Sequence, residues 1–171
     1  MEQRSPDTLG MHELQIVDAA ELAAAYAAAQ YGVALDGDVF PLRVGALASD
    51  LEAYWPASRY VFITAWNPAS EPHSDEANDS ANALLAARLD SIGTTRQPAW
   101  AQDVDGSWKE PGWLVADLGQ AQGDALAREF GQAAVLCWKP REPVRLRMLL
   151  GRPPPTTPES GEWAGVTDWV E

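Results

Sequence analysis

The sequence predicts a single α/β domain with a mixed β-sheet flanked by helices. Helical and strand patterns alternate along the chain, which is typical of this fold class. A length of 171 residues with 46% hydrophobic content suits one domain with a packed core. The Asp105-Gly106 pair between two apolar stretches predicts a hairpin, which argues against a purely parallel sheet. We expect an N-terminal extension over residues 1–17, the domain over residues 18–150, and a flexible Pro-rich tail over residues 151–171.

Two helices and two strands are expected in the first half of the chain. The first helix has the capping-box spacing of Asp18 and Glu21, and Gly32 should end it. Pro41 cannot donate to a ladder, so its strand should lie at a sheet edge. In order, the expected elements are a helix over 18–30, a strand over 39–44, a helix over 48–54, and a continuously apolar, central strand over 60–65.

The sequence from residue 75 onward predicts two further helices and four strands. Ser74 is the expected N-cap of a long helix that Gly93 ends. Apolar residues alternate with Arg145 and Arg147, the pattern of a half-exposed strand. In order, the expected elements are a helix over 75–92, strands over 100–104 and 113–116, a helix over 120–130, and strands over 133–138 and 144–148. The prolines from Pro153 onward predict a polyproline-like tail.

Composition and charge exclude several classes of function. The formal net charge of −13 argues against nucleic-acid binding, because phosphate backbones would be repelled. No run of about 18 apolar residues predicts a membrane span, and the polar start does not resemble a secretory signal. A single cysteine, Cys137, fits a reducing cytoplasm and is interpreted as a core residue. No metal site and no cofactor are expected, because the chain lacks His/Cys spacing for zinc and the glycines of a phosphate-binding loop.

The most informative segment joins the strand over 60–65 to the long helix that follows. In open α/β sheets, ligands bind beyond strand ends and beside helix N-termini. Asn67 lies in this segment, and Asn78 and Asn82 begin a helix face that continues with apolar residues. These amides either tie down the neighbouring loop or bind a ligand, and both interpretations stay open. The lone His73 of the loop is more often solvated than catalytic.

Two further polar residues are candidates for the same site. Glu110 stands between Trp108 and Trp113, where apolar surroundings could raise its pKa toward that of a general acid or base. Its alternative role is a hydrogen-bonded support. Gln132 follows a helix-ending glycine and opens a strand, so its side chain could reach a neighbouring loop.

Four blocks of sequence resemble the bacterial domain-of-unknown-function family numbered 3293. They are residues 62–70, Asn78, residues 105–110 and residues 130–133, and the resemblance covers about residues 20–150. It implies no activity, because the family has none established. The motif positions that it marks are Thr64, Asn67, Pro68, Ser70, Asn78, Trp108, Glu110, Gly131 and Gln132.

Two functions follow as hypotheses. The first is a polar small-ligand site, nucleoside- or sugar-like, around Asn67, with Glu110 as the candidate for any catalysis. Its residues would be Thr64, Asn67, Ser70, Asn78, Glu110 and Gln132. The second is a non-enzymatic acidic protein that binds or inhibits a basic protein partner through tryptophan anchors. A basic strand edge around Arg145 and Arg147 could also meet another copy or discourage aggregation.

Overall fold

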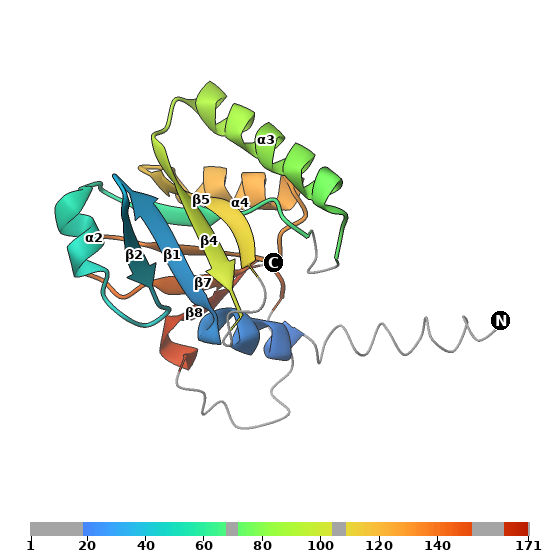
Figure 1. Cartoon of the computed structure of the whole chain (residues 1–171). Helices are drawn as coiled ribbons and strands as arrows, with labels where there is room; N and C mark the ends of the chain where they lie inside the picture. Colours follow the sequence, from blue (N-terminus) through green and yellow to red (C-terminus); the bar gives the residue numbers. More distant parts are fainter. Residues whose placement is uncertain (1–18, 68–71, 104–108, 152–162, 171) are drawn as a thin grey trace.

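The computed structural model describes residues 19–67, 72–103, 109–151 and 163–170, which form one curled, eight-stranded sheet with helices on its faces (Figure 1). The strand order is β2-β1-β4-β5-β3-β6-β7-β8, antiparallel throughout except for the parallel pair β7 and β8. The predicted class, an α/β domain with a mixed sheet, is therefore confirmed. The strands are β1 (Gln30–Leu35), β2 (Asp38–Leu42), β3 (Tyr60–Ile63), β4 (Arg96–Gln102), β5 (Lys109–Ala116), β6 (Ala134–Trp138), β7 (Arg145–Met148) and β8 (Thr167–Trp169). The helices cover residues 19–28, α2 (Ser49–Tyr54), α3 (Asp75–Ile92), α4 (Gln120–Glu129) and the 3₁₀ turn η2 (Ala164–Val166).

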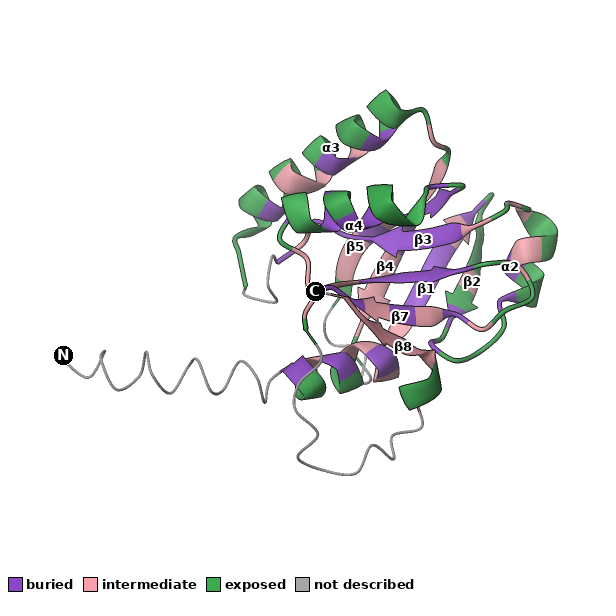
Figure 2. Ribbon diagram, turned by 180° about the vertical axis from the view of Figure 1, so that it is seen from behind, coloured by how far each residue is buried: buried purple, intermediate pink, exposed green. Residues whose placement is uncertain are grey.

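The central strand β3 is buried on both faces, as its continuous apolar sequence predicts (Figure 2). Successive side chains of a strand point to opposite faces. Tyr60 and Phe62 therefore enter one core, which also contains residues of α2 and of the helix over 19–28. Val61 and Ile63 enter a second core, which α3 and α4 cover.

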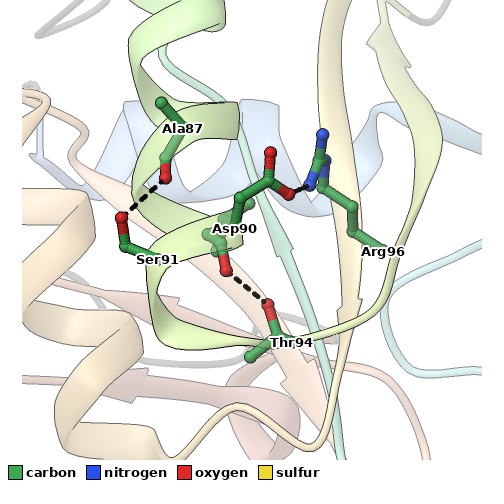
Figure 3. Close-up of polar contacts among 6 residues, drawn as sticks. Ala87, Asp90, Ser91, Thr94 and Arg96 are labelled. Atoms are coloured by element: carbon green, nitrogen blue, oxygen red, sulfur yellow. Dashed lines mark hydrogen bonds and ion pairs between the residues drawn. The ribbon is translucent and has the colours of Figure 1, made fainter.

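Helix α3 begins and ends where its capping residues predict. The Ser74 hydroxyl accepts a hydrogen bond from the Ala77 N–H at 3.1 Å, and Gly93 adopts a left-handed conformation with φ 88°. Figure 3 shows the last turn, where the Ser91 hydroxyl donates to the Ala87 carbonyl and Asp90 pairs with Arg96 at the start of β4. The Asp90–Arg96 pair joins the end of the helix directly to the sheet.

The main differences from the predicted elements lie in β1 and in the hairpin of β4 and β5. The expected first helix ends early, and Gly32 lies within β1 instead of ending the helix. The Trp100 ring covers Gly32, since a Cβ added there would lie 2.5 Å from Trp100 Cζ2. Strands β4 and β5 begin earlier than predicted and include Pro98 and Pro111. Each proline lies opposite a tryptophan across the hairpin.

The C-terminal residues 163–170 pack on the sheet, although the sequence predicts no strand there. Strand β8 extends the sheet beyond β7, so the prediction of a basic edge strand at Arg145 and Arg147 is wrong. Arg145 donates two hydrogen bonds to Asp168 in β8, at 2.9 and 2.8 Å. Arg147 makes the same bidentate contact with Asp124 in α4. Both cations are neutralised within the chain.

Acid should weaken the attachment of β8. The Arg145 guanidinium, which donates to the carboxylate, lowers the pKa of Asp168 below its ordinary value. A depressed folded pKa means that this stabilisation is complete above the unfolded pKa of about 3.9 and is lost as the pH falls through the folded value. We therefore expect wild type to be more stable than Asp168→Asn in urea at pH 7, with a difference that shrinks below about pH 4. A difference that stays constant down to pH 2.5 would show that the charge of Asp168 is not the source of the stability difference.

Candidate functional site

A small cavity lies at the end of β3, where three segments of the chain meet. Its two neighbours β5 and β6 run antiparallel to β3, so β6 begins near the end of β3, and the first residues of β5 extend past that end, beside the segment that follows it. Thr64 and Asn67 follow β3, Glu110 is the second residue of β5, and Gln132 lies two residues before β6. These four side chains line one cavity of about 50 Å³. The remaining walls are mostly aromatic and aliphatic and include Tyr26, Tyr31, Phe62, Ala101 and Leu146.

Asn67 and Asn78 form a reciprocal pair that fixes the end of the β3 segment. The Asn67 N–H donates to Asn78 Oδ1 at 2.8 Å, and Asn78 Nδ2 donates to Asn67 Oδ1 at 2.8 Å. Asn67 Oδ1 also accepts the His73 N–H at 2.9 Å. Asn67 has a φ of 46°, a left-handed conformation that asparagine tolerates better than most residues. Both amides are buried, so the bonds replace those that water would make.

The Glu110 carboxylate is held at the cavity by the same asparagine. Asn67 Nδ2 donates to Glu110 Oε2 at 3.0 Å. The Tyr31 hydroxyl of the cavity wall donates to the Tyr26 carbonyl at 2.5 Å. Burial, with smaller contributions from Tyr26 and Glu110, raises the pKa of Tyr31 well above its ordinary value, so this phenol stays protonated.

The aromatic neighbours of Glu110 differ from those that the sequence predicts. Trp113 packs against the second core, below α3, and its ring stacks on the Arg96 guanidinium at 4.5 Å. Residues three apart on a strand point to opposite faces, so Trp113 does not flank Glu110. The expectation that Trp113 surrounds the carboxylate is wrong, and Tyr26, Tyr31 and Phe62 share its cavity instead.

Thr64 and Gln132 bind the backbone on either side of Trp66. Thr64 Oγ1 donates to the Pro111 carbonyl at 2.7 Å and accepts the Trp66 N–H at 3.0 Å. Gln132 Nε2 donates to the carbonyls of Trp66 and Phe130, at 3.1 and 3.4 Å. Both Gln132 donors are therefore directed at backbone carbonyls, and the residue lines the cavity.

The structure brings together most of the residues that the sequence predicts for the site. Thr64, Asn67, Glu110 and Gln132 line the cavity, and Asn78 lies behind Asn67. The predicted residues Pro68, Ser70 and Trp108 lie outside the described residues. Of the other residues considered, Asn82 has a buried Oδ1 without a hydrogen-bond partner, and His73 contributes backbone atoms only to these contacts.

The two tyrosines of the cavity were not predicted as site residues. Tyr26 lies within the helix that the sequence predicts over 18–30, and Tyr31 lies at its expected end. No local pattern in the sequence marks them, because they reach the cavity only after β1 has paired with β4. Among the residues that the structure describes, no group of three or more His, Cys, Asp or Glu side chains could hold a metal ion.

Gly112→Ala should distort this site. A Cβ at Gly112 would lie 2.7 Å from the Ile63 carbonyl oxygen and 3.1 Å from Thr64 Cβ. The backbone oxygen cannot move away without disturbing the pairing of β3 with β5. We expect a loss of about 1–3 kcal/mol in the free energy of unfolding, measured in urea. Gly37→Ala is the control, because it also replaces a glycine. The positive φ of Gly37 imposes strain on an alanine, but nothing lies within 4 Å of the added Cβ, so no steric clash is added. A smaller loss at Gly112 than at Gly37 would contradict this reading.

Comparison with known proteins identifies one family. No match was found among curated proteins or among solved structures. Within the described part of the chain, no helix is long and apolar enough to cross a membrane. The model of the family described as "Protein of unknown function (DUF3293)" matches residues 63–135, a shorter stretch than the resemblance predicted from the sequence. This stretch contains all four polar residues that line the cavity. The predicted resemblance is thus confirmed, and over residues 63–135 the chain matches DUF3293, a family of unknown function.

Proposed function

We propose that the chain binds a small polar ligand, nucleoside- or sugar-like, at the cavity formed by Thr64, Asn67, Glu110 and Gln132. The observation that carries this proposal is that four polar residues, Thr64, Asn67, Glu110 and Gln132, line one cavity whose other walls are mostly aromatic and aliphatic, with the Glu110 carboxylate bound to Asn67 Nδ2. Polar groups that converge in an otherwise apolar concavity are typical of small-molecule sites.

The hydrogen-bonding chemistry of the cavity indicates which part of a ligand it accepts. A carboxylate and an amide oxygen accept hydrogen bonds, so the complementary ligand group is a donor. A volume of about 50 Å³ accommodates one hydroxyl or amino group, since a water molecule occupies about 30 Å³ in the liquid. Sugars and nucleosides carry such groups, and their remaining atoms would lie outside the cavity.

The structure favours a division of roles between the two asparagines. Asn78 makes all of its side-chain hydrogen bonds to Asn67 and His73, so we assign it to positioning. Asn67 Nδ2 uses one hydrogen for Glu110 and has a second that can reach a ligand oxygen. The structural and the ligand-binding interpretations of these amides are therefore compatible.

A thermal-shift experiment tests the proposal. Adenosine, cytidine, ribose and glucose would each be added to the wild type, to Glu110→Gln and to Gln132→Leu. A ligand at 100 times its Kd stabilises the folded state by about 2.7 kcal/mol, so the melting temperature should rise by several degrees. The rise should be lost or reduced in both variants.

Glu129→Gln is the matched control for the change of charge. Glu129 lies on α4 and pairs with Arg88 at the surface, away from the cavity lining. Its variant should keep the full ligand-dependent rise. The proposal fails if none of the four compounds shifts wild type, or if the shift is the same in all variants.

A further inference from the structure

A second concavity lies at the edge of the sheet, between β2 and α2. It has a volume of about 510 Å³, and it shares no lining residue with the cavity at Asn67. Figure 1 shows α2 beside the edge strand β2. We call this concavity the edge groove, and it is lined by Asp38, Val39, Phe40, Pro41, Leu47, Ala48, Ser49, Asp50 and Leu51.

The edge groove exposes apolar side chains to an unusual extent. Val39 is 60% exposed and Leu47 is 58% exposed, the two highest values among the large hydrophobic residues that the structure describes as exposed. Tyr54 on α2 packs against Phe40 with the rings tilted by 32° and their centroids 5.4 Å apart, and it donates a hydrogen bond to Asp36. These contacts connect α2 to the β1–β2 hairpin. Apolar surface in a concavity of this kind is typical of an interaction site.

The charges around the groove are acidic. Asp38 and Asp50 line it and are exposed, and Asp36 lies at the adjacent turn. Arg43 is the single basic residue between positions 30 and 54. The complementary partner is therefore basic, and its cations would lie over these carboxylates while an apolar side chain enters the groove.

The backbone of β2 limits how a partner can bind. Asp36 and Gly37 form a two-residue turn, both with positive φ, so Leu35 and Asp38 are the first hydrogen-bonded pair of the hairpin. Alternation of the pairs then directs Pro41 away from β1, at the open edge of the sheet. Since Pro41 has no N–H, the edge cannot pair with a long added strand. Recognition must come mainly from side chains.

We propose that the edge groove docks a short basic segment of a partner protein, with a leucine-sized side chain between Val39 and Leu47 and lysine or arginine side chains facing Asp38 and Asp50. A second copy of this chain is a poor occupant on charge, because each copy carries a formal net charge of −13. Residues 1–17 are a poor occupant on charge, since they contain three acids and one arginine.

A peptide-binding experiment on the full chain tests the proposal. The probe is a fluorescein-labelled eight-residue peptide with two leucines among lysines and glycines, followed by anisotropy at low and high salt. Two comparison peptides replace the leucines with serine or the lysines with glutamate. The Leu/Lys peptide should bind most tightly, and its Kd should rise with salt.

Variants locate the binding. Leu47→Ser and the double variant Asp38→Asn/Asp50→Asn should each raise the Kd by about tenfold or more, equivalent to about 1.4 kcal/mol. The matched controls are Leu84→Ser and Glu76→Gln/Asp79→Asn on α3, which change exposed residues of the same kinds. These controls should leave the Kd unchanged.

Several results would overturn the proposal. Absence of binding, equal binding of the Ser/Lys peptide, or equal weakening by the α3 controls would reduce the groove to an ordinary acidic surface. Sedimentation that shows a dimer abolished by Leu47→Ser would assign the groove to a second copy. Displacement of the probe by a peptide of residues 1–17 would assign it to the chain's own N-terminal segment.

Discussion

Asn67→Ala is expected to reduce the free energy of unfolding by about 3 kcal/mol. The change removes hydrogen bonds to the His73 N–H, the Asn78 side chain and the Glu110 carboxylate, and leaves buried polar groups without their partners. Alanine also tolerates the φ of 46° less well than asparagine. Urea denaturation monitored by tryptophan fluorescence measures the loss.

Asn67→Gly separates the two causes of this loss. Glycine adopts a positive φ without strain, so this variant loses only the amide and should be more stable than the alanine variant. Asn78→Ala removes the reciprocal partner and should lower the free energy of unfolding by about 2 kcal/mol. Residue 67 remains an asparagine in this variant, so no backbone strain is added there. If Asn67→Ala were as stable as wild type, the asparagine pair could not be what holds the β3 segment.

Asp124→Ala is expected to lower the free energy of unfolding by about 3 kcal/mol, because it leaves the Arg147 guanidinium without a counter-charge between α4 and β7. Asp124 and Arg147 make a bidentate pair at 2.8 and 2.7 Å, with side chains that are only 11% and 14% exposed. Removing one partner leaves the other poorly solvated and without its counter-charge. The contact also joins α4 to the sheet, so amide hydrogen exchange in α4 should accelerate in the variant.

A double-mutant cycle identifies the origin of this effect. Asp124→Leu/Arg147→Leu removes both charges and should recover much of the stability lost by the single changes. The surface pair Arg88 and Glu129 is the control, with side chains that are 52% and 36% exposed. Breaking that pair should cost less than about 1 kcal/mol, because water screens it. Equal costs for the two pairs would contradict the role of burial.

Ligand binding and stability can be separated at the proposed site. Asn67 and Asn78 hold the segment after β3, so variants at these positions change stability and binding together. Gln132→Leu removes a polar side chain from the cavity lining and also a hydrogen bond to the Trp66 carbonyl. Glu110→Gln keeps the size of the side chain and removes its charge. It is therefore the most informative variant in the ligand screen.

Local signals in the sequence were sufficient to predict the ends of α3, the burial of β3 and the edge position of β2. Ser74 and Gly93 bound α3 because capping depends on a few neighbouring atoms. The apolar run of β3 predicts a strand covered on both faces, and Pro41 predicts an edge strand at β2. Each of these inferences requires only the chemistry of adjacent residues.

Elements that depend on distant partners were missed. Gly32 is typical of a helix end, yet it lies in β1 because the Trp100 ring of β4 packs over it. Pro98 and Pro111 would normally interrupt strands, yet both lie in a hairpin that pairs them with tryptophans. Strand β8 pairs with β7, and the contact of Asp168 with Arg145 joins residues that are separated by 23 positions in the chain.

The candidate polar residues Thr64, Asn67, Ser70, Asn78, Glu110 and Gln132 could all be selected from the sequence, although Ser70 lies outside the described residues. Their chemistry is a property of each side chain, and their positions follow from the ends of predictable elements. That Thr64, Asn67, Glu110 and Gln132 meet follows from the fold alone, because antiparallel pairing places the start of β6 near the end of β3 and the start of β5 beside the segment that follows β3. The fold also decided that Tyr31 rather than Trp113 shares the cavity with Glu110, because the face of a strand on which each residue lies is fixed by the pairing register.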